Sequence, residues 1–249
     1  MSALAPESYA AWRGSEIGAA TDRLERGLIL DLAGDVGGRE VLDVGCGDGE
    51  FAVELGRRGA FVTGVDASPA MIGAAKRRAE RLGAAVPFQV ATAQQLPFSA
   101  GQFDLVTAIT ILCFVDDPSP VFGEIARVLR PGGRVVIGEL GKWSTWAAGR
   151  RVRAWLGSPI WRRGRFRTTN ELRRLTEGAG LTVEQVRGAI FYPRSRFAAH
   201  LLSAVDSALG RRTTIGAAFI ALSARKPLFQ TAQACGGAPV PPASVAPVA

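Results

Sequence analysis

The sequence is poor in lysine, histidine and cysteine, and each shortage narrows the kinds of protein it can encode. Lysine occurs only at positions 76, 142 and 226, so arginine supplies 27 of the 30 basic residues behind the net charge of +8. The three cysteines, at 46, 113 and 235, have no metal-ligand spacing and are odd in number, which favours a reducing compartment. We therefore expect a cytoplasmic protein without a bound metal ion.

Long apolar runs are missing as well. The most apolar late segments, 197–205 and 215–222, are shorter than the ~20 residues of a membrane-spanning helix. Residues 1–18 lack the basic start and apolar centre of a secretory signal. With 249 residues and 47% hydrophobic content, the chain suits one sizeable domain.

A glycine-rich loop follows an apolar run in the segment Val41-Leu-Asp-Val-Gly-Cys-Gly-Asp-Gly-Glu50. This pattern predicts a strand that passes into a helix through a turn tight enough for a ligand to touch the backbone. The dinucleotide fingerprint G-x-G-x-x-G requires a third glycine where this chain has Glu50. A nicotinamide-dependent oxidoreductase is therefore a distant alternative.

Further strand-like and helix-like runs follow in a regular order. The run 61–66 ends in Asp66, at the place where an acid can accept hydrogen bonds from both hydroxyls of a ribose. Ser68 and Pro69 predict the start of a helix. Strands are predicted at 86–91, 103–108, 181–190 and 216–224, helices at 17–32 and 197–209, and a helix, a Pro-Gly-Gly turn and a strand over 125–139.

The loop VLDVGCGDGEFA (41–52), the acid at 66 and the helix–turn–strand segment over 125–139 resemble the class I S-adenosylmethionine-dependent methyltransferases, in the small-molecule, type 11-like group. The resemblance covers residues 39–140. It implies an α/β fold, a Rossmann-like three-layer sandwich with a seven-stranded, mostly parallel sheet whose last strand is antiparallel. It also implies S-adenosyl-L-methionine as cofactor, S-adenosyl-L-homocysteine as product, and in-line methyl transfer to O, N or C of a small, partly apolar acceptor.

The resemblance implies where the cofactor binds. Asp43 is expected near the methionine end of the cofactor, and Asp66 is expected at the cofactor's ribose. The acids at 48 and 50 also suit the positive charges of the methionine end. Thr92 replaces the family's adenine-binding aspartate. The segment 112–118 lacks the paired histidines of many relatives, and this absence predicts a more apolar wall beside the methyl group. The predicted cofactor-binding residues are Asp43, Gly45, Cys46, Gly47, Gly49, Asp66, Ala67, Met71, Thr92, Ala93, Gln94, Ala108 and Ile109.

We predict an N-terminal helical arm at 1–38, the methyltransferase domain at 39–226 and a disordered tail at 227–249. Within the domain, 141–168 is predicted to be a basic lid, since 142–174 contains ten basic residues against one acid and four of the five tryptophans lie nearby. The predicted substrate-binding residues are Trp143, Trp146, Arg150 and Trp155.

The basic segment leaves three interpretations open: a lid over a small-molecule substrate, a contact with a membrane surface that holds a lipid or quinone-like acceptor, or an RNA-binding face. No RNA-binding module and no Asn-Pro-Pro-Tyr-like tetrapeptide is present, so we expect no nucleic-acid partner. His200, the only histidine, and Tyr192 are the candidate catalytic bases, with Tyr9 as a further one. Since none is secure, a cofactor-binding protein without turnover is the alternative from another class. No motif encodes the oligomeric state.

Overall fold

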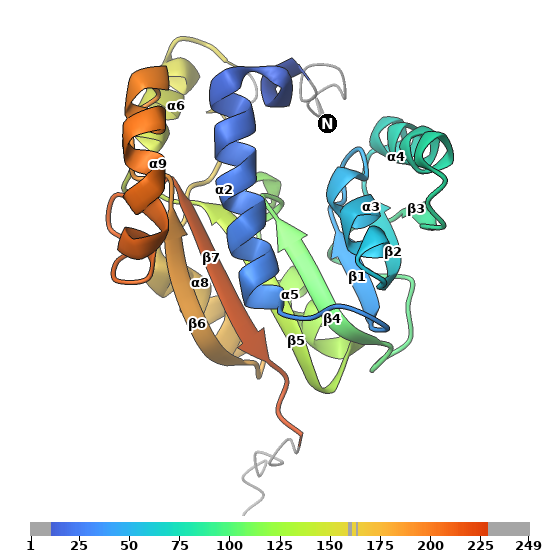
Figure 1. The fold of residues 1–249 in the computed structure, drawn as a ribbon. Helices are drawn as coiled ribbons and strands as arrows, with labels where there is room; N and C mark the ends of the chain where they lie inside the picture. The colour runs from blue at the N-terminus through green and yellow to red at the C-terminus, as the bar shows by residue number, and fades with distance from the viewer. Residues whose placement is uncertain (1–10, 159–160, 163, 229–249) are drawn as a thin grey trace, which may run out of the picture.

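The computed structural model describes residues 11–158, 161–162 and 164–228. Its centre is a seven-stranded sheet with the order β3-β2-β1-β4-β5-β7-β6 (Figure 1). The strands are β1 (Glu40–Val44), β2 (Phe61–Asp66), β3 (Phe88–Val90), β4 (Phe103–Ile109), β5 (Leu129–Leu140), β6 (Thr182–Ala189) and β7 (Phe219–Arg225). Strands β1 to β5 pair in parallel, and β7 runs antiparallel to both β5 and β6. The predicted sheet, with its antiparallel last strand, is confirmed.

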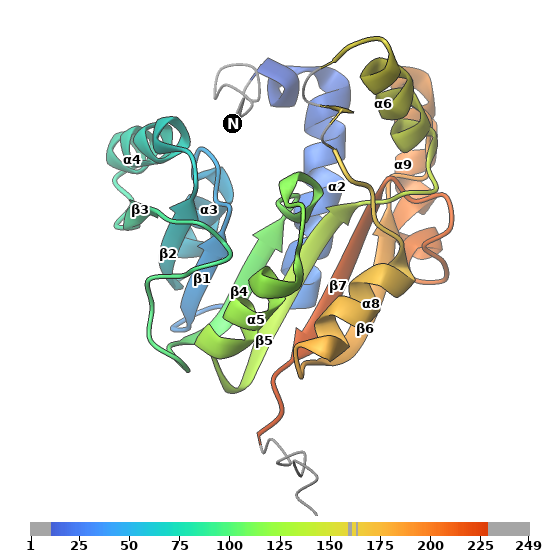
Figure 2. The same cartoon turned by 180° about the vertical axis from the view of Figure 1, so that it is seen from behind.

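Helices cover both faces of the sheet. They are α2 (Glu16–Ala33), α3 (Glu50–Arg57), α4 (Pro69–Leu82), the 3₁₀ helix η1 (Leu112–Phe114), α5 (Ser119–Val128), α6 (Thr145–Trp155), α8 (Thr169–Gly178) and α9 (Arg196–Gly210). Side chains of α2, α3, α4 and α9 form one apolar cluster, on the face that is in front in Figure 1. Those of α5 and α8 form a second, on the face in front in Figure 2. The result is the predicted three-layer sandwich.

Capping residues set the helix boundaries. Ser68 accepts a hydrogen bond from the N–H of Met71 and Pro69 occupies the first position of α4. Helix α8 begins with a capping box, in which Thr168 and Glu171 each bond to the other's backbone. Within the described part of the chain, every helix is too short or too polar to cross a bilayer.

The fifth strand begins earlier than predicted. We predicted a Pro-Gly-Gly turn between helix and strand, but β5 already includes Leu129, which pairs with Phe103 of β4. The pairing shifts register before Leu105, and Gly132 adopts a φ of +78° that other residues rarely reach. The three turn residues therefore form an irregular entry to the strand.

The strand order places a ligand site at β1. From this strand the chain proceeds outward to β2 and β3 on one side, and later to β4 and β5 on the other. Ligands of open α/β sheets bind at such a switch point, beyond the carboxyl ends of the strands. The loops that follow Val44 and Ile109 meet there.

Candidate functional site

A cavity of about 1910 Å³ lies at the carboxyl ends of β1, β2 and β4. Its walls come from α2, the loop after β1, the end of β2, residues 91–94, the loop after β4 and part of 162–165. Eleven of the predicted cofactor residues line it: Asp43, Gly45, Cys46, Gly47, Asp66, Ala67, Met71, Thr92, Ala93, Gln94 and Ile109. The structure thus brings together most of the predicted cofactor site.

Gly49 and Ala108 were predicted at the cofactor but do not line the cavity. Ala108 is fully buried in the cluster on the α5 side, because alternate residues of β4 point to opposite faces of the sheet. Gly49 precedes α3 with a φ of +76°, and a Cβ there would lie 2.8 Å from Ala75 and from the Phe88 ring. Both residues serve packing.

The loop after β1 presents bare backbone to the cavity. Gly45 has a φ of +73°, and a Cβ there would lie 2.0 Å from Cγ2 of Ile111. Gly47 has a φ of +55° and lines the cavity, and a Cβ there would have no protein atom within 4 Å. These residues fit a bulky cofactor lying against the loop, because a side chain at 47 would occupy that space.

Two backbone donors hold the carboxylate of Asp66 at the cavity. The N–H of Gly47 donates to Oδ2 at 3.0 Å, and the N–H of Ser68 donates to Oδ1 at 2.8 Å. A carboxylate offers about four acceptor positions. Asp66 therefore keeps the capacity to accept hydrogen bonds from two ribose hydroxyls.

Asp43 lies buried beneath the loop. It pairs in register with Thr107 of β4, whose hydroxyl donates to Oδ1 at 2.7 Å. Burial raises the pKa of Asp43 to about 7; the Thr107 hydrogen bond opposes this shift and the negative Asp66 adds to it. A positively charged ligand in the cavity would favour the ionised form.

We expect binding of S-adenosylmethionine to weaken as the pH falls below 7. Below its pKa of about 7, Asp43 must lose a proton before it can stabilise the cofactor's positive charges. Because binding is linked to the loss of this proton, the affinity for S-adenosylmethionine should fall by as much as about tenfold for each pH unit below 7. Calorimetric titrations from about pH 6 to pH 8 measure this loss, which Asp43→Asn should abolish. A pH dependence that survives in the asparagine variant would assign it to another group.

Acids at 48 and 50 join α2 to the cofactor loop. Asp48 is buried and bonds to Arg13 and, at 2.6 Å, to Arg78. Glu50 pairs with Arg13 at 2.5 Å and with Arg26 at 2.7 Å. The sequence predicts that these acids suit the cofactor's positive charges, but in the structure arginines neutralise them.

The loop after β4 forms the opposite wall. Thr110 has a φ of +53°, rare for a non-glycine residue, and its N–H donates to the carbonyl of Gly138 at 2.7 Å. The N–H of Leu112 donates at 2.7 Å to the fully buried Glu139, whose pKa is raised by burial to about 7. The apolar side chains of this loop on the cavity wall are Ile109, Ile111, Phe114 and Val115. Of the segment 112–118, where the sequence predicts an apolar wall, Phe114 and Val115 line the cavity together with the acids Asp116 and Asp117.

Two free cysteines are buried near the site, Cys46 on the cavity wall and Cys113 behind it. Burial raises the pKa of each thiol above its usual value. Both remain protonated near neutral pH, so neither is an activated nucleophile.

The four predicted substrate residues do not line the cavity. Trp143 and Trp155 are 65% and 85% exposed. Trp146 is buried and its Nε1–H donates to the carbonyl of Tyr192 at 2.8 Å. The guanidinium of Arg150 lies 5.6 Å from the Trp146 ring and 4.9 Å from that of Trp161, so cation–π packing occupies these side chains. The lid segment lines the cavity with Arg162, Gly164 and Arg165 instead.

The candidate bases from the sequence are not found at the cavity. Tyr192 is fully buried and absent from the cavity wall, and burial raises the pKa of its hydroxyl, which keeps it protonated. The side chain of His200 and the whole of Tyr9 lie outside the described residues.

Sequence reasoning missed Glu25 of α2, which lines the cavity. The signal was available, because Asp22, Glu25, Arg26 and Ile29 have the spacing i, i+3, i+4, i+7 of one helix face, and all four line the cavity. The prediction of this helix rests on its apolar positions and does not include its charged face.

Comparison with known proteins identifies relatives. Residues 42–137 match a family model described as "Methyltransferase domain". A ubiquinone biosynthesis O-methyltransferase of Aeromonas salmonicida is 34% identical over 181 residues, which cover 67% of this chain and 73% of that protein.

Two solved structures share the fold. A Thermotoga maritima methyltransferase, described as a possible histamine N-methyltransferase, has a TM-score of 0.69 at 24% identity and covers 88% of this chain and 95% of its own. Phosphoethanolamine N-methyltransferase 2 of Haemonchus contortus, in complex with S-adenosyl-L-methionine, has a TM-score of 0.66 at 20% identity. The match covers 89% of this chain and 57% of the Haemonchus chain.

Proposed function

The chain belongs to the S-adenosylmethionine-dependent methyltransferases, and from this premise we propose that it methylates a hydroxyl oxygen of a small, partly apolar acceptor. The methyltransferase activity and the cofactor S-adenosyl-L-methionine are those of the family. The acceptor class and the acceptor atom are our proposal.

The apolar part of the cavity carries this proposal. Beyond the cofactor loop, the wall includes Ile29, Ile109, Ile111, Phe114 and Val115. Such a wall favours an acceptor with an apolar body, oriented by a few polar groups. The O-methyltransferase activity in the name of the Aeromonas relative supports oxygen as the acceptor atom.

The cofactor would supply an activated methyl group, and the protein's part is alignment and charge. In this proposal Asp66 holds the ribose and Asp43 faces the positive end. The apolar wall excludes water and fixes the acceptor oxygen in line with the methyl carbon.

Incubation with methyl-labelled S-adenosylmethionine and a lysate of the host tests the acceptor class. We expect the label in the organic-soluble, low-mass fraction, as a base-stable methyl ether. Label in a nuclease- or protease-sensitive macromolecular fraction would contradict the proposal, and so would label in an amine.

We propose further that the acceptor is reached at an anionic membrane surface. Helix α6 packs on the segment before α9, because the Nε1–H of Trp146 donates to the carbonyl of Tyr192 and the guanidinium of Arg194 lies 5.6 Å from the Trp146 ring. The two helices occupy the same corner of the molecule in Figures 1 and 2. Residues 142–170 and 190–218 contain twelve lysines and arginines and a single acid, the buried Asp206. Exposed apolar side chains lie on and beside these helices: Trp143, Val152, Trp155, Leu156, Phe197, Leu201, Val205 and Ile215.

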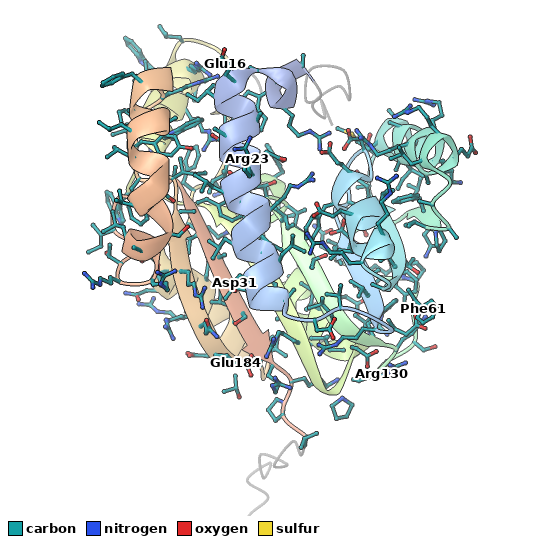
Figure 3. All side chains as sticks on the ribbon, viewed as in Figure 1. Glu16, Arg23, Asp31, Phe61, Arg130 and Glu184 are labelled. Carbon is teal, nitrogen blue, oxygen red and sulfur yellow. The ribbon has the colours of Figure 1, made fainter. Side chains whose placement is uncertain are left out.

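This α6–α9 surface combines apolar side chains with an excess of positive charge, of which Lys142 and Arg165 are paired with Glu171 and Asp116. Such a combination matches anionic lipid. We expect the protein to sediment with phosphatidylglycerol vesicles more than with phosphatidylcholine vesicles, and less in high salt. Trp155→Ser combined with Leu201→Ser should reduce sedimentation. Phe61→Ser is the control, because Phe61 is 64% exposed but lies far from α6 and α9 (Figure 3). Dimerisation or RNA binding through this surface, without lipid binding, would contradict the proposal.

We also propose a cytoplasmic location, supported by the two free thiols at 46 and 113.

A further inference from the structure

Glu25 differs from the other seven acids on the cavity wall, because it forms no hydrogen bond or ion pair with another described residue. Asp43, Asp48, Glu50 and Asp66 have the partners given above. Asp22 pairs with Arg26, Asp116 with Arg165, and Asp117 accepts from the N–H of Ser119. For Glu25, the described part of the chain offers neither an ion pair nor a hydrogen bond.

Glu25 lines the cavity from α2, and its helix position turns it away from the cofactor loop. The next residue along α2, Arg26, pairs with Glu50 and Glu54 of α3, on the cofactor side. Successive residues of a helix point about 100° apart. The charged neighbour of Glu25 is instead Arg150 of α6, on the opposite side of α2.

The surroundings keep the proton on Glu25 at a pH where most carboxylates have lost it. Burial raises the pKa of Glu25 to about 8, Asp22 adds to the shift, and Arg150 opposes it. The hydroxyl of Tyr192 also lies within its electrostatic reach. A carboxylate with such a pKa is suited to exchange protons with a weakly acidic hydroxyl near neutral pH.

We propose that Glu25 is the general base of the methyl transfer, a role that rests on the proposed hydroxyl acceptor. The acceptor oxygen forms a bond to the methyl carbon while the bond from that carbon to sulfur breaks, and its electron pair stays on sulfur. The hydroxyl proton passes to the Glu25 carboxylate and then to solvent. Arg150 remains charged and stabilises the ionised carboxylate before the proton arrives.

A pair of catechols of different acidity tests this role. With 4-methylcatechol, whose hydroxyls are protonated at neutral pH, Glu25→Gln should lower kcat by about 10²- to 10³-fold. With 4-nitrocatechol, which ionises at neutral pH without help, the same substitution should change kcat by less than about threefold. Glu25→Asp keeps the carboxylate and should restore part of the rate. Asp31→Asn, on the outer side of the same helix (Figure 3), is the matched control.

The pH profile is a second kinetic measure. For 4-methylcatechol, kcat of the unaltered protein should rise with pH up to about 8 and then level off, since only the ionised carboxylate accepts a proton. Glu25→Gln should lose this limb of the profile. The KM for S-adenosylmethionine should stay the same, because Glu25 forms no hydrogen bond or ion pair with the described residues of the cofactor loop.

Thermal unfolding provides a readout that needs neither cofactor nor acceptor. Because the pKa of Glu25 in the folded state lies above its ordinary value of 4.5, the folded protein loses stability as the pH rises from that value to about 8. Glutamine does not ionise, so the Tm of Glu25→Gln should exceed that of the unaltered protein by a margin that grows over this range. A lower Tm throughout would mean a carboxylate engaged in a structural bond, and would overturn the proposal.

The kinetic outcomes separate the two proposals. If the unaltered protein methylates 4-methylcatechol and Glu25→Gln does so at the same rate, Glu25 is not the base, while the hydroxyl acceptor stands. An equal loss on both catechols would also overturn the role of Glu25, because it would indicate damage to the site. If the unaltered protein methylates neither catechol but methylates amines, the acceptor class fails and the base with it.

Discussion

Replacement of Asp66 with alanine is expected to weaken S-adenosylmethionine binding by about 10- to 100-fold, or about 1.5–3 kcal/mol, the range for hydrogen bonds to a charged group. The substitution removes the acceptor proposed for both ribose hydroxyls. It also leaves the N–H groups of Gly47 and Ser68 without the carboxylate that orders them. Isothermal titration calorimetry of the folded variant measures the loss.

The same titrations with S-adenosylhomocysteine provide the control. Both molecules contain the ribose, so Asp66→Ala should weaken them equally. Only S-adenosylmethionine contains a sulfonium, so Asp43→Asn should weaken its binding more than that of the product. An unchanged dissociation constant for Asp66→Ala would remove this residue from the site.

Replacement of Asp48 with alanine is expected to lower the free energy of unfolding by about 3 kcal/mol. Asp48 is 5% exposed and lies between Arg13 and Arg78, and the removal of one member of a buried ion pair costs about 3–5 kcal/mol. We expect the lower end of this energy range, because both arginines keep another partner in the variant. Arg13 keeps its ion pair with Glu50, and Arg78 keeps its hydrogen bond to the backbone carbonyl of residue 48. Urea denaturation measures the change.

Asp31→Ala is the control for this substitution. Asp31 also pairs with an arginine, Arg187, but its side chain is 63% exposed, and exposed pairs contribute about 1 kcal/mol or less. A loss of less than about 1 kcal/mol for Asp48→Ala would mean that the arginines around it find other partners.

The fold could be predicted because its signals are local. The glycines at 45 and 47 have positive φ angles, Ser68 and Pro69 begin α4, and Thr168 caps α8. Each of these features depends on a few neighbouring residues. The order of strands and helices could therefore be predicted, and most of the predicted cofactor residues on the cavity wall lie at strand ends.

The acceptor side could not be predicted because its contacts are distant in the sequence. Glu25 and Arg150 are 125 positions apart, and the sequence contains no pattern that brings them together. The tryptophans at 143, 146 and 155 are predicted to bind substrate from the composition of their segment and its place between the fifth strand and the next helix. In the structure two of them are exposed and the third packs against the segment around Tyr192.

Glu25 and Arg26 are consecutive residues of one helix, and this has a consequence for the order of events in turnover. Arg26 pairs with Glu50 beside the cofactor loop, while Glu25 lines the cavity as the proposed base. Any tilt of α2 that one reactant induces therefore repositions the group that meets the other. Such a tilt would make binding of the two reactants cooperative, and by linkage each reactant would change the affinity for the other by the same factor.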